Sequence, residues 1–186
     1  MITPQNWKVL VKKQAELDQL IVQKSPVDLK WVSHCNAARL KLALLVEVGE
    51  FANEIKSFKA WRKKPEIDWA KAREELIDCL GYFLGLDGIY KINMSPVLID
   101  KNKEKGASFN ELLLDFFAKT NALYIEKNEQ FYTLEDSEIP ENKKNTYYDW
   151  LRVFNQISEK LQIDEQKLLN IYLAKNEINL QRAQAK

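Results

Sequence analysis

The fold is decided by the stretch LALLVEVGEFANE at residues 42–54. At about 100° per residue, Glu47, Glu50 and Glu54 fall within one narrow stripe of a helix. The neighbouring stripe is apolar and includes Phe51. These carboxylates therefore border the face that a helix buries, whereas acids that only solvate a helix lie opposite its core.

A second stretch, EELIDCLGYFL at residues 74–84, repeats the arrangement. Glu75 and Asp78 are i and i+3 on one face, and Leu80 lies on the neighbouring apolar face. If the two helices pack antiparallel, as their short connection predicts, the acid pairs converge. Converging carboxylates repel one another, and divalent cations would neutralise them.

The residue types around these acids narrow the choice of metal. His34 is the single histidine, so the chain lacks the histidine clusters of zinc sites and the Glu-x-x-His pairs of di-iron bundles. Ligation by oxygen alone favours magnesium, with manganese as a substitute, and points to phosphate chemistry. The alternative is that both acidic pairs are ordinary exposed charges on helix surfaces.

Apolar spacing follows the helical period almost throughout. The chain has five glycines and five prolines, with no glycine-rich phosphate loop and no alternating strand pattern. We expect an all-α helical bundle in one catalytic domain, residues 1–186, with a less assignable insertion at about 92–145. The expected helices span residues 4–24, 33–60, 67–90, 109–129, 146–161 and 164 to the end.

Several helix ends carry capping signals. Ser108 with Glu111 forms a capping box, and Thr146 and Asp164 are expected N-caps. Residues 135–145 are acidic and contain proline and asparagine, so we expect a loop there.

Composition excludes several functional classes. The chain has 46% hydrophobic residues and a net charge of +1, which fits a folded protein without the basic field of a nucleic-acid binder. No apolar run is long enough to span a membrane, and no signal peptide is visible, so we expect a cytoplasmic protein. Cys35 and Cys79 allow one disulfide, but two reduced thiols are the favoured reading.

A third stretch, YLAKNEINLQR at residues 172–182, has the pattern of a binding helix. Lys175, Asn179 and Arg182 are i, i+4 and i+7 on one face. Two cations there could hold phosphates, and an amide can both donate to and accept from a base edge. The alternative is a solvated helix end, which the helix dipole favours for cations.

Together with QAELD at residues 14–18, these stretches resemble the dimeric, all-α dUTPase family. That family belongs to the all-α NTP pyrophosphatase superfamily, which includes MazG-type enzymes. The resemblance covers about residues 12–182, except for 92–145. It implies a magnesium-dependent homodimer that cleaves dUTP, and also dUDP, between the α- and β-phosphates and releases dUMP.

The resemblance also implies roles for single residues. Glu47, Glu50, Glu75 and Asp78 match the metal ligands of the family, and Glu50 also matches the carboxylate that deprotonates the attacking water. The substrate-binding candidates are Gln14, Lys59, Trp61, Tyr82, Lys175, Asn179 and Arg182. Trp61 shares the acidic stripe only if its helix continues that far, and periodicity alone makes Trp61 and Tyr82 packing residues.

Two alternatives stay open at this level. Gly81 stands where the family usually has histidine, so the sugar pocket is expected to differ. A related pyrophosphatase acting on dCTP or a modified nucleotide is therefore the enzymatic alternative, and the amides of Gln14 and Asn179 are the residues in dispute. The alternative of another class is a non-catalytic helical protein whose acidic stripes bind a basic partner.

Overall fold

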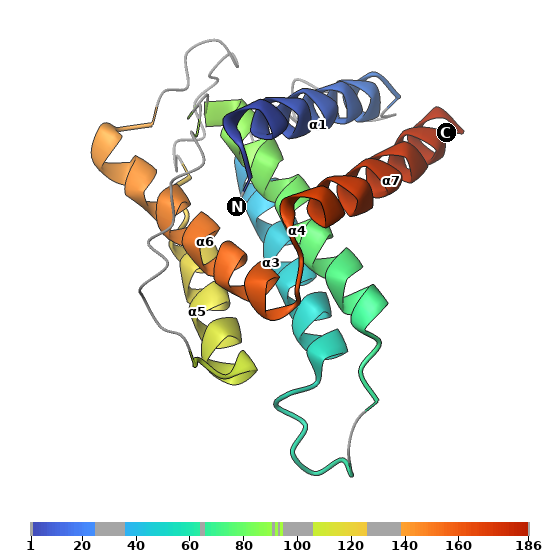
Figure 1. The fold of residues 1–186 in the computed structure, drawn as a ribbon. Coiled ribbons are helices and arrows are strands. Elements are labelled where there is room, and N and C mark those ends of the chain that lie inside the picture. Colours follow the sequence, from blue (N-terminus) through green and yellow to red (C-terminus); the bar gives the residue numbers. More distant parts are fainter. Residues whose placement is uncertain are drawn as a thin grey trace.

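The computed structural model describes residues 2–24, 36–63, 66–90, 92, 94, 106–125 and 139–185. These residues form helices and no strand, which confirms the all-α expectation. With the labels of Figure 1, the helices are α1 (Pro4–Lys24), α3 (Asn36–Ile55), α4 (Trp69–Tyr90), α5 (Phe109–Ala122), α6 (Glu141–Lys160) and α7 (Glu165–Gln184). None of these described helices combines the length and apolarity that a membrane span requires.

Helices α3 and α4 form an antiparallel pair at the centre of the molecule (Figure 1). Leu44 and Val48 on α3 and Leu80 and Phe83 on α4 are completely buried. Burying each such side chain stabilises the fold by about 1.5–3 kcal/mol. The acidic stripes border these apolar faces, so the packing that buries the leucines also brings the acids of the two helices together.

Helices α5 and α6 cover one side of this pair. Trp150 of α6 is completely buried and stacks on Phe83 of α4, with ring centroids 4.0 Å apart and planes 8° from parallel. Its indole Nε1 donates to Thr120 Oγ1 of α5 at 2.9 Å, so the polar atom of the ring is satisfied in the core. Phe116 of α5 meets Phe51 of α3 edge to face. Part of the stretch 92–145 thus packs into the common core.

Helices α1 and α7 lie side by side and cross α4 (Figure 1). Glu165 at the start of α7 accepts hydrogen bonds from the backbone N–H of Thr3 at 2.6 Å and from Asn6 Nδ2 at 2.7 Å. Farther along, Asn176 Nδ2 donates to the carbonyl of Lys13 at 3.2 Å. These contacts fix the position of the last helix along the first one.

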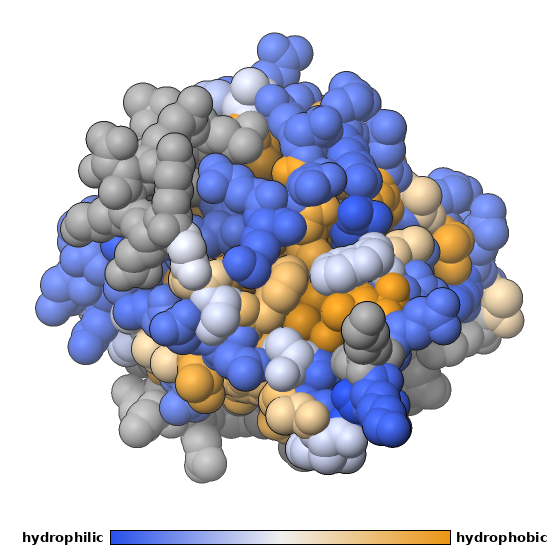
Figure 2. Space-filling model, turned by 60° about the horizontal axis from the view of Figure 1, so that its bottom comes forward, coloured by the Kyte–Doolittle hydropathy of each residue, from blue (hydrophilic) through white to orange (hydrophobic). Residues whose placement is uncertain are grey.

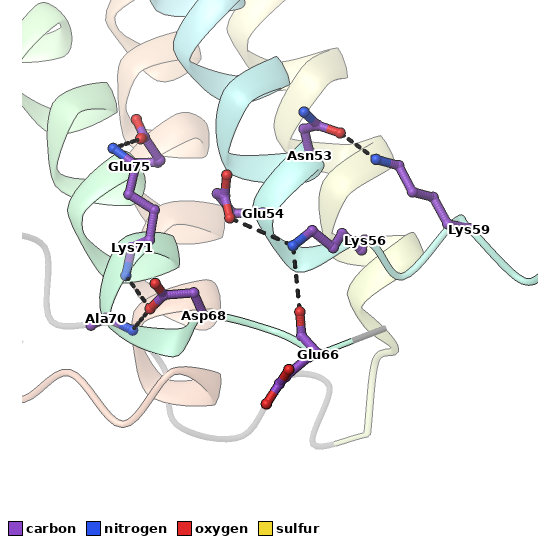
Figure 3. Close-up of polar contacts among 9 residues, drawn as sticks. All are labelled: Asn53, Glu54, Lys56, Lys59, Glu66, Asp68, Ala70, Lys71 and Glu75. Atoms are coloured by element: carbon purple, nitrogen blue, oxygen red, sulfur yellow. Dashed lines mark hydrogen bonds and ion pairs between the residues drawn. The ribbon is translucent and has the colours of Figure 1, made fainter. Parts of the chain in front are cut away.

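The capping signals at two helix starts are confirmed. Ser108 and Glu111 form the reciprocal capping box before α5. Asp164 accepts a hydrogen bond from the backbone N–H of Lys167 at 2.8 Å at the start of α7. At α4, Asp68 accepts from the N–H groups of Ala70 and Lys71 (Figure 3).

The helix predicted to reach residue 60 ends earlier, at Ile55. Lys56 adopts a φ of 57°, a left-handed conformation that turns the chain out of the helix. Residues 33–35, at the predicted start of this helix, lie outside the described residues. The early end matters because Trp61 is no longer on the helix that carries Glu47.

Two further predicted boundaries are wrong. The helix expected from Thr146 begins at Glu141, so residues 141–145 are not a loop. Thr146 lies inside α6, where its Oγ1 donates to the carbonyl of Lys143 at 2.8 Å and does not cap the helix. The helix expected to reach residue 129 ends at Ala122, and residues 126–129 lie outside the described part of the chain.

Apolar side chains also reach the surface. Figure 2 shows apolar residues exposed near the centre of the face turned forward there, with hydrophilic residues around them. Over the whole described surface, the exposed large hydrophobic residues are Val9, Ile21, Leu42, Val46, Phe58, Trp61, Trp69, Leu114, Leu173 and Ile178. These exposed apolar side chains are available for contact with another molecule.

Candidate active site

Three carboxylates meet where α3 packs against α4. Glu75 and Asp78 are one turn apart on the same face of α4, and Glu47 reaches the same place from α3. One oxygen from each carboxylate lies within 4.8 Å of the other two. Glu75 is buried, and Glu47 and Asp78 are half-buried. Oxygens at this spacing can share one cation, since metal–oxygen distances are about 2.0–2.6 Å.

Burial and mutual repulsion raise the pKa values of Glu47 and Asp78. The pKa of Glu47 rises to about 7, first because burial desolvates it and then because of the charges of Asp78 and Glu50. Desolvation also raises the pKa of Asp78, although the hydrogen bond from Lys175 opposes that rise. The cluster therefore becomes fully ionised at neutral pH only when positive charge is supplied.

Two lysines supply part of that charge. Lys175 of α7 places its Nζ 2.7 Å from Asp78 Oδ2. Lys71 of α4 pairs with Glu75 one turn away, as Figure 3 shows. The hydrogen bond to Glu75 raises the pKa of Lys71. Both ammonium groups stand against acids that belong to the cluster.

Glu50 and Glu54 lie farther along the stripe of α3. Glu50 is exposed and is not one of the three carboxylates that meet, but its charge acts on Glu47 one turn away. Glu54 is half-buried and lies 3.9 Å from the ammonium of Lys56, which also donates to the carbonyl of Glu66 (Figure 3). The structure thus separates an inner group of three acids from Glu50 at its exposed edge.

The donor set fits a hard divalent cation. All three converging side chains offer oxygen, which suits magnesium or manganese. Cys79 follows Asp78 in the chain, but it is completely buried, and desolvation raises the pKa of its thiol. It therefore offers no thiolate that would favour zinc.

Gln14 of α1 is held from two sides. Its Nε2 donates to Asp18 Oδ1 at 2.7 Å, and its Oε1 accepts from the hydroxyl of Tyr172 at 2.9 Å. A Cβ placed on Gly81 would lie 3.4 Å from Gln14 Oε1, so the backbone of α4 comes close to this amide. Because Gly81 is one turn after Asp78, the amide lies near the carboxylate cluster.

Tyr82 lies on the same helix as Asp78, close to both of these groups. It is half-buried and one turn after Asp78 on α4. Desolvation raises the pKa of its hydroxyl, and the negative charges of Glu47, Asp78 and Asp18 raise it further. Tyr82 is therefore near both the carboxylate cluster and the residues around Gln14.

Lys59 and Trp61 lie in the connection after α3 and not on the helical stripe. Lys59 Nζ donates to Asn53 Oδ1 at 2.5 Å (Figure 3). Trp61 is 75% exposed and meets the ring of Phe58 edge to face. The expectation that Trp61 shares the stripe of Glu47 is not met, because the helix stops at Ile55.

Asn179 and Arg182 follow Lys175 along α7. Asn179 is half-buried and Arg182 is exposed. Tyr172, which contacts Gln14, precedes Asn179 by seven residues, or about 10 Å of helix. Since Asn176, one turn before Asn179, donates to the carbonyl of Lys13, Gln14 lies level with the middle of α7.

The sequence matches one known family over nearly its whole length. The match is to the dUTPase family and covers residues 6–186, including every residue of the carboxylate cluster. The chain belongs to the dUTPase family. This membership implies dUTP diphosphatase activity, so the protein is a hydrolase and its substrate is a nucleotide. No curated protein and no solved structure matches the chain.

The candidate site contains three residues that sequence reasoning did not select. Asp18 and Tyr172 hold the amide of Gln14, and Lys71 pairs with Glu75. The i, i+4 spacing of Gln14 and Asp18 and of Lys71 and Glu75 was visible in the sequence and allows such pairs. The contact of Tyr172 was not visible, since it depends on how α7 lies against α1.

Proposed function

We propose that Glu47, Glu75 and Asp78 hold magnesium, with Glu50 at the exposed edge, and that dUTP is cleaved there between its α- and β-phosphates. The observation that carries this proposal is the meeting of three carboxylate oxygens within 4.8 Å, with the pKa of Glu47 raised to about 7. A folded protein keeps such a repulsive group when a cation relieves it. Manganese would fit the same oxygen ligands.

The residues of the site divide the chemistry between them. Bound magnesium would supply positive charge that neutralises the phosphates and lowers the pKa of the attacking water. Glu50 is exposed and not committed to the inner group, so it is free to orient that water and take its proton. Lys175 can exchange Asp78 for a phosphate oxygen without leaving the site. The products are dUMP and pyrophosphate, or dUMP and phosphate from dUDP.

Nucleotide binding is proposed for the residues around the cluster. Tyr82 is half-buried near Glu47, Asp78 and Asp18, where an aromatic ring can pack on a sugar or base. Gln14 is held in place near Gly81, as a base-reading amide needs to be. The full proposed set is Gln14, Lys59, Trp61, Tyr82, Lys175, Asn179 and Arg182.

A homodimer is part of the proposal. Leu42 and Val46 of α3 are 64% and 52% exposed, and Leu114 of the adjacent α5 is 72% exposed. Large apolar side chains on neighbouring helices suit a second copy of the chain. Trp61, itself 75% exposed, could then meet the site of either copy. Light scattering after size exclusion should give twice the chain mass of 21.8 kDa.

We also propose one catalytic domain, residues 1–186, that acts on free nucleotides in the cytoplasm. Cys79 is a free, buried thiol, in keeping with a reducing compartment. Cys35 lies outside the described residues. The net charge of +1 provides no basic field for nucleic acid, so small nucleotides are the proposed partners.

The test compares nucleotide hydrolysis by wild type and by Glu50→Gln. Wild type should release dUMP and pyrophosphate from dUTP in magnesium, accept dUDP, and turn over dCTP poorly. Glu50→Gln should keep its fold and lose about a hundredfold or more in kcat, as expected for a lost general base. Glu54→Gln, one turn farther on the same stripe, is the matched control and should stay active. Full activity in Glu50→Gln would contradict the mechanism, and preference for dCTP would contradict the substrate.

A further inference from the structure

The amide of Gln14 has a fixed orientation because of what surrounds it. Asp18 is one turn later on α1, and its carboxylate can only accept hydrogen bonds when ionised. The amide must therefore turn its NH₂ group toward Asp18. A flipped amide would place Oε1 against the carboxylate oxygen, and two acceptors repel. The hydroxyl of Tyr172, which donates to Oε1, supports the same orientation from α7.

Asp18 is an unusual residue to find in this position. Its side chain is largely buried, with Oδ2 3.4 Å from where a Cβ on Gly85 would lie. Burial raises its pKa to about 6, and the hydrogen bond from Gln14 only partly offsets the rise. A buried carboxylate destabilises a protein. Its contact with Gln14 therefore suggests a task in the site.

The orientation of an amide decides between uracil and cytosine. Uracil presents an N3–H donor beside a carbonyl acceptor, whereas cytosine presents an N3 acceptor beside an amino donor. An amide offers one donor and one acceptor side by side. It complements uracil in one orientation and cytosine in the flipped one. After its bonds to Asp18 and Tyr172, Gln14 still has one N–H and one lone pair to offer a ligand.

We infer that Asp18 and Tyr172 are positioning residues that lock the Gln14 amide and thereby select uracil over cytosine. This inference rests on the proposed role of Gln14 at the base. Specificity then depends on the two residues that hold the amide, because an amide that is free to flip would accept both bases. Asp18 is the stronger part of the lock, since a hydroxyl such as that of Tyr172 can donate or accept.

The test compares dUTP with dCTP in Asp18→Asn. An asparagine of the same shape can donate or accept, so Gln14 gains the freedom to flip. The ratio of kcat/KM for dUTP to that for dCTP should fall about tenfold or more, mainly through better turnover of dCTP. Tyr172→Phe should lower the ratio less. Glu16→Gln, an exposed acid on the same helix, is the matched control and should keep the wild-type ratio.

The outcomes separate this inference from the proposal beneath it. An unchanged ratio in a folded Asp18→Asn protein, checked by circular dichroism and melting, would overturn the inference. If Gln14→Ala lowers the ratio while Asp18→Asn and Tyr172→Phe do not, Gln14 reads the base but is not locked by them. If Gln14→Ala also leaves the ratio unchanged, the base-reading role of Gln14 itself is wrong.

Discussion

The ammonium of Lys175 lies 2.7 Å from the carboxylate of Asp78, and this pair joins α7 to the carboxylate cluster of α4. Both side chains are about four-fifths buried, so the pair is well shielded from solvent. In the described structure the lysine is paired with Asp78, a carboxylate that is proposed to bind magnesium. Magnesium binding and the Lys175–Asp78 pair should therefore compete, and nucleotide phosphates should draw the lysine away.

Replacing Lys175 should separate metal binding from turnover. Lys175→Met removes the competing cation, so magnesium without nucleotide should bind about threefold to tenfold more tightly, equivalent to about 1 kcal/mol. Hydrolysis of dUTP should slow because a phosphate contact is lost. Calorimetric titration with magnesium measures the first effect. Lys119→Met, which removes a similar inter-helix pair with Asp149, is the control and should change neither quantity.

The raised pKa of Glu47 predicts how the metal-free protein responds to pH. Since its pKa is about 7 in the folded state, above the ordinary 4.5 of a glutamate, the folded state holds this proton more tightly than the unfolded state does. Its contribution to stability is present at low pH and is lost as the pH rises toward 7. In EDTA, Glu47→Gln should therefore gain stability relative to wild type between pH 5 and pH 8. Melting curves at both pH values check this, and a constant difference would contradict it.

Asp18→Asn should stabilise the protein at alkaline pH. The pKa of Asp18 is raised from 3.8 to about 6, so its contribution to stability is present below about pH 4 and is lost as the pH rises through 6. At pH 8 the variant should be more stable than wild type by about 1–3 kcal/mol, and the difference should vanish near pH 4. Urea denaturation at the two pH values measures it. A variant that is less stable at pH 8 would show that Asp18 serves the fold.

Truncation of two tryptophans should change stability by very different amounts. Trp150→Ala removes a buried ring that stacks on Phe83 and bonds Thr120, and should cost about 3–5 kcal/mol of stability. Trp61→Ala removes an exposed ring and should change stability by less than about 0.5 kcal/mol. If Trp61 binds the nucleotide, its loss should instead raise KM for dUTP. A Trp61→Ala protein with unchanged KM would remove Trp61 from the site.

Local signals in the sequence predicted much of the helical framework. Ser108 with Glu111, and Asp164, cap their helices as expected, because a side-chain cap depends only on residues within one turn. The end of α3 was not predictable in this way. Lys56 adopts a left-handed conformation without being glycine, so nothing in the residue type signals the turn. The start of α6 at Glu141 was hidden because Pro140 precedes it without a side-chain cap.

Local sequence patterns also predicted part of the candidate site, whereas contacts between distant helices were not predictable. Periodicity and the short connection predicted that Glu47, Glu50, Glu75 and Asp78 converge. In the structure Glu47, Glu75 and Asp78 meet, whereas Glu50 lies at the exposed edge. Contacts between α1, α4 and α7 were beyond periodicity, because they depend on crossing helices that are distant in sequence. The ion pair of Lys175 with Asp78 and the hydrogen bond of Tyr172 to Gln14 both depend on such crossings.

The most direct test is the magnesium dependence of dUMP formation from dUTP in wild type and in Asp78→Asn. The wild-type rate should require magnesium, and the variant should lose about a hundredfold or more in rate or need far more magnesium, because a proposed ligand is gone. An Asp78→Asn enzyme with the rate and magnesium dependence of wild type would contradict the placement of the metal at Glu47, Glu75 and Asp78.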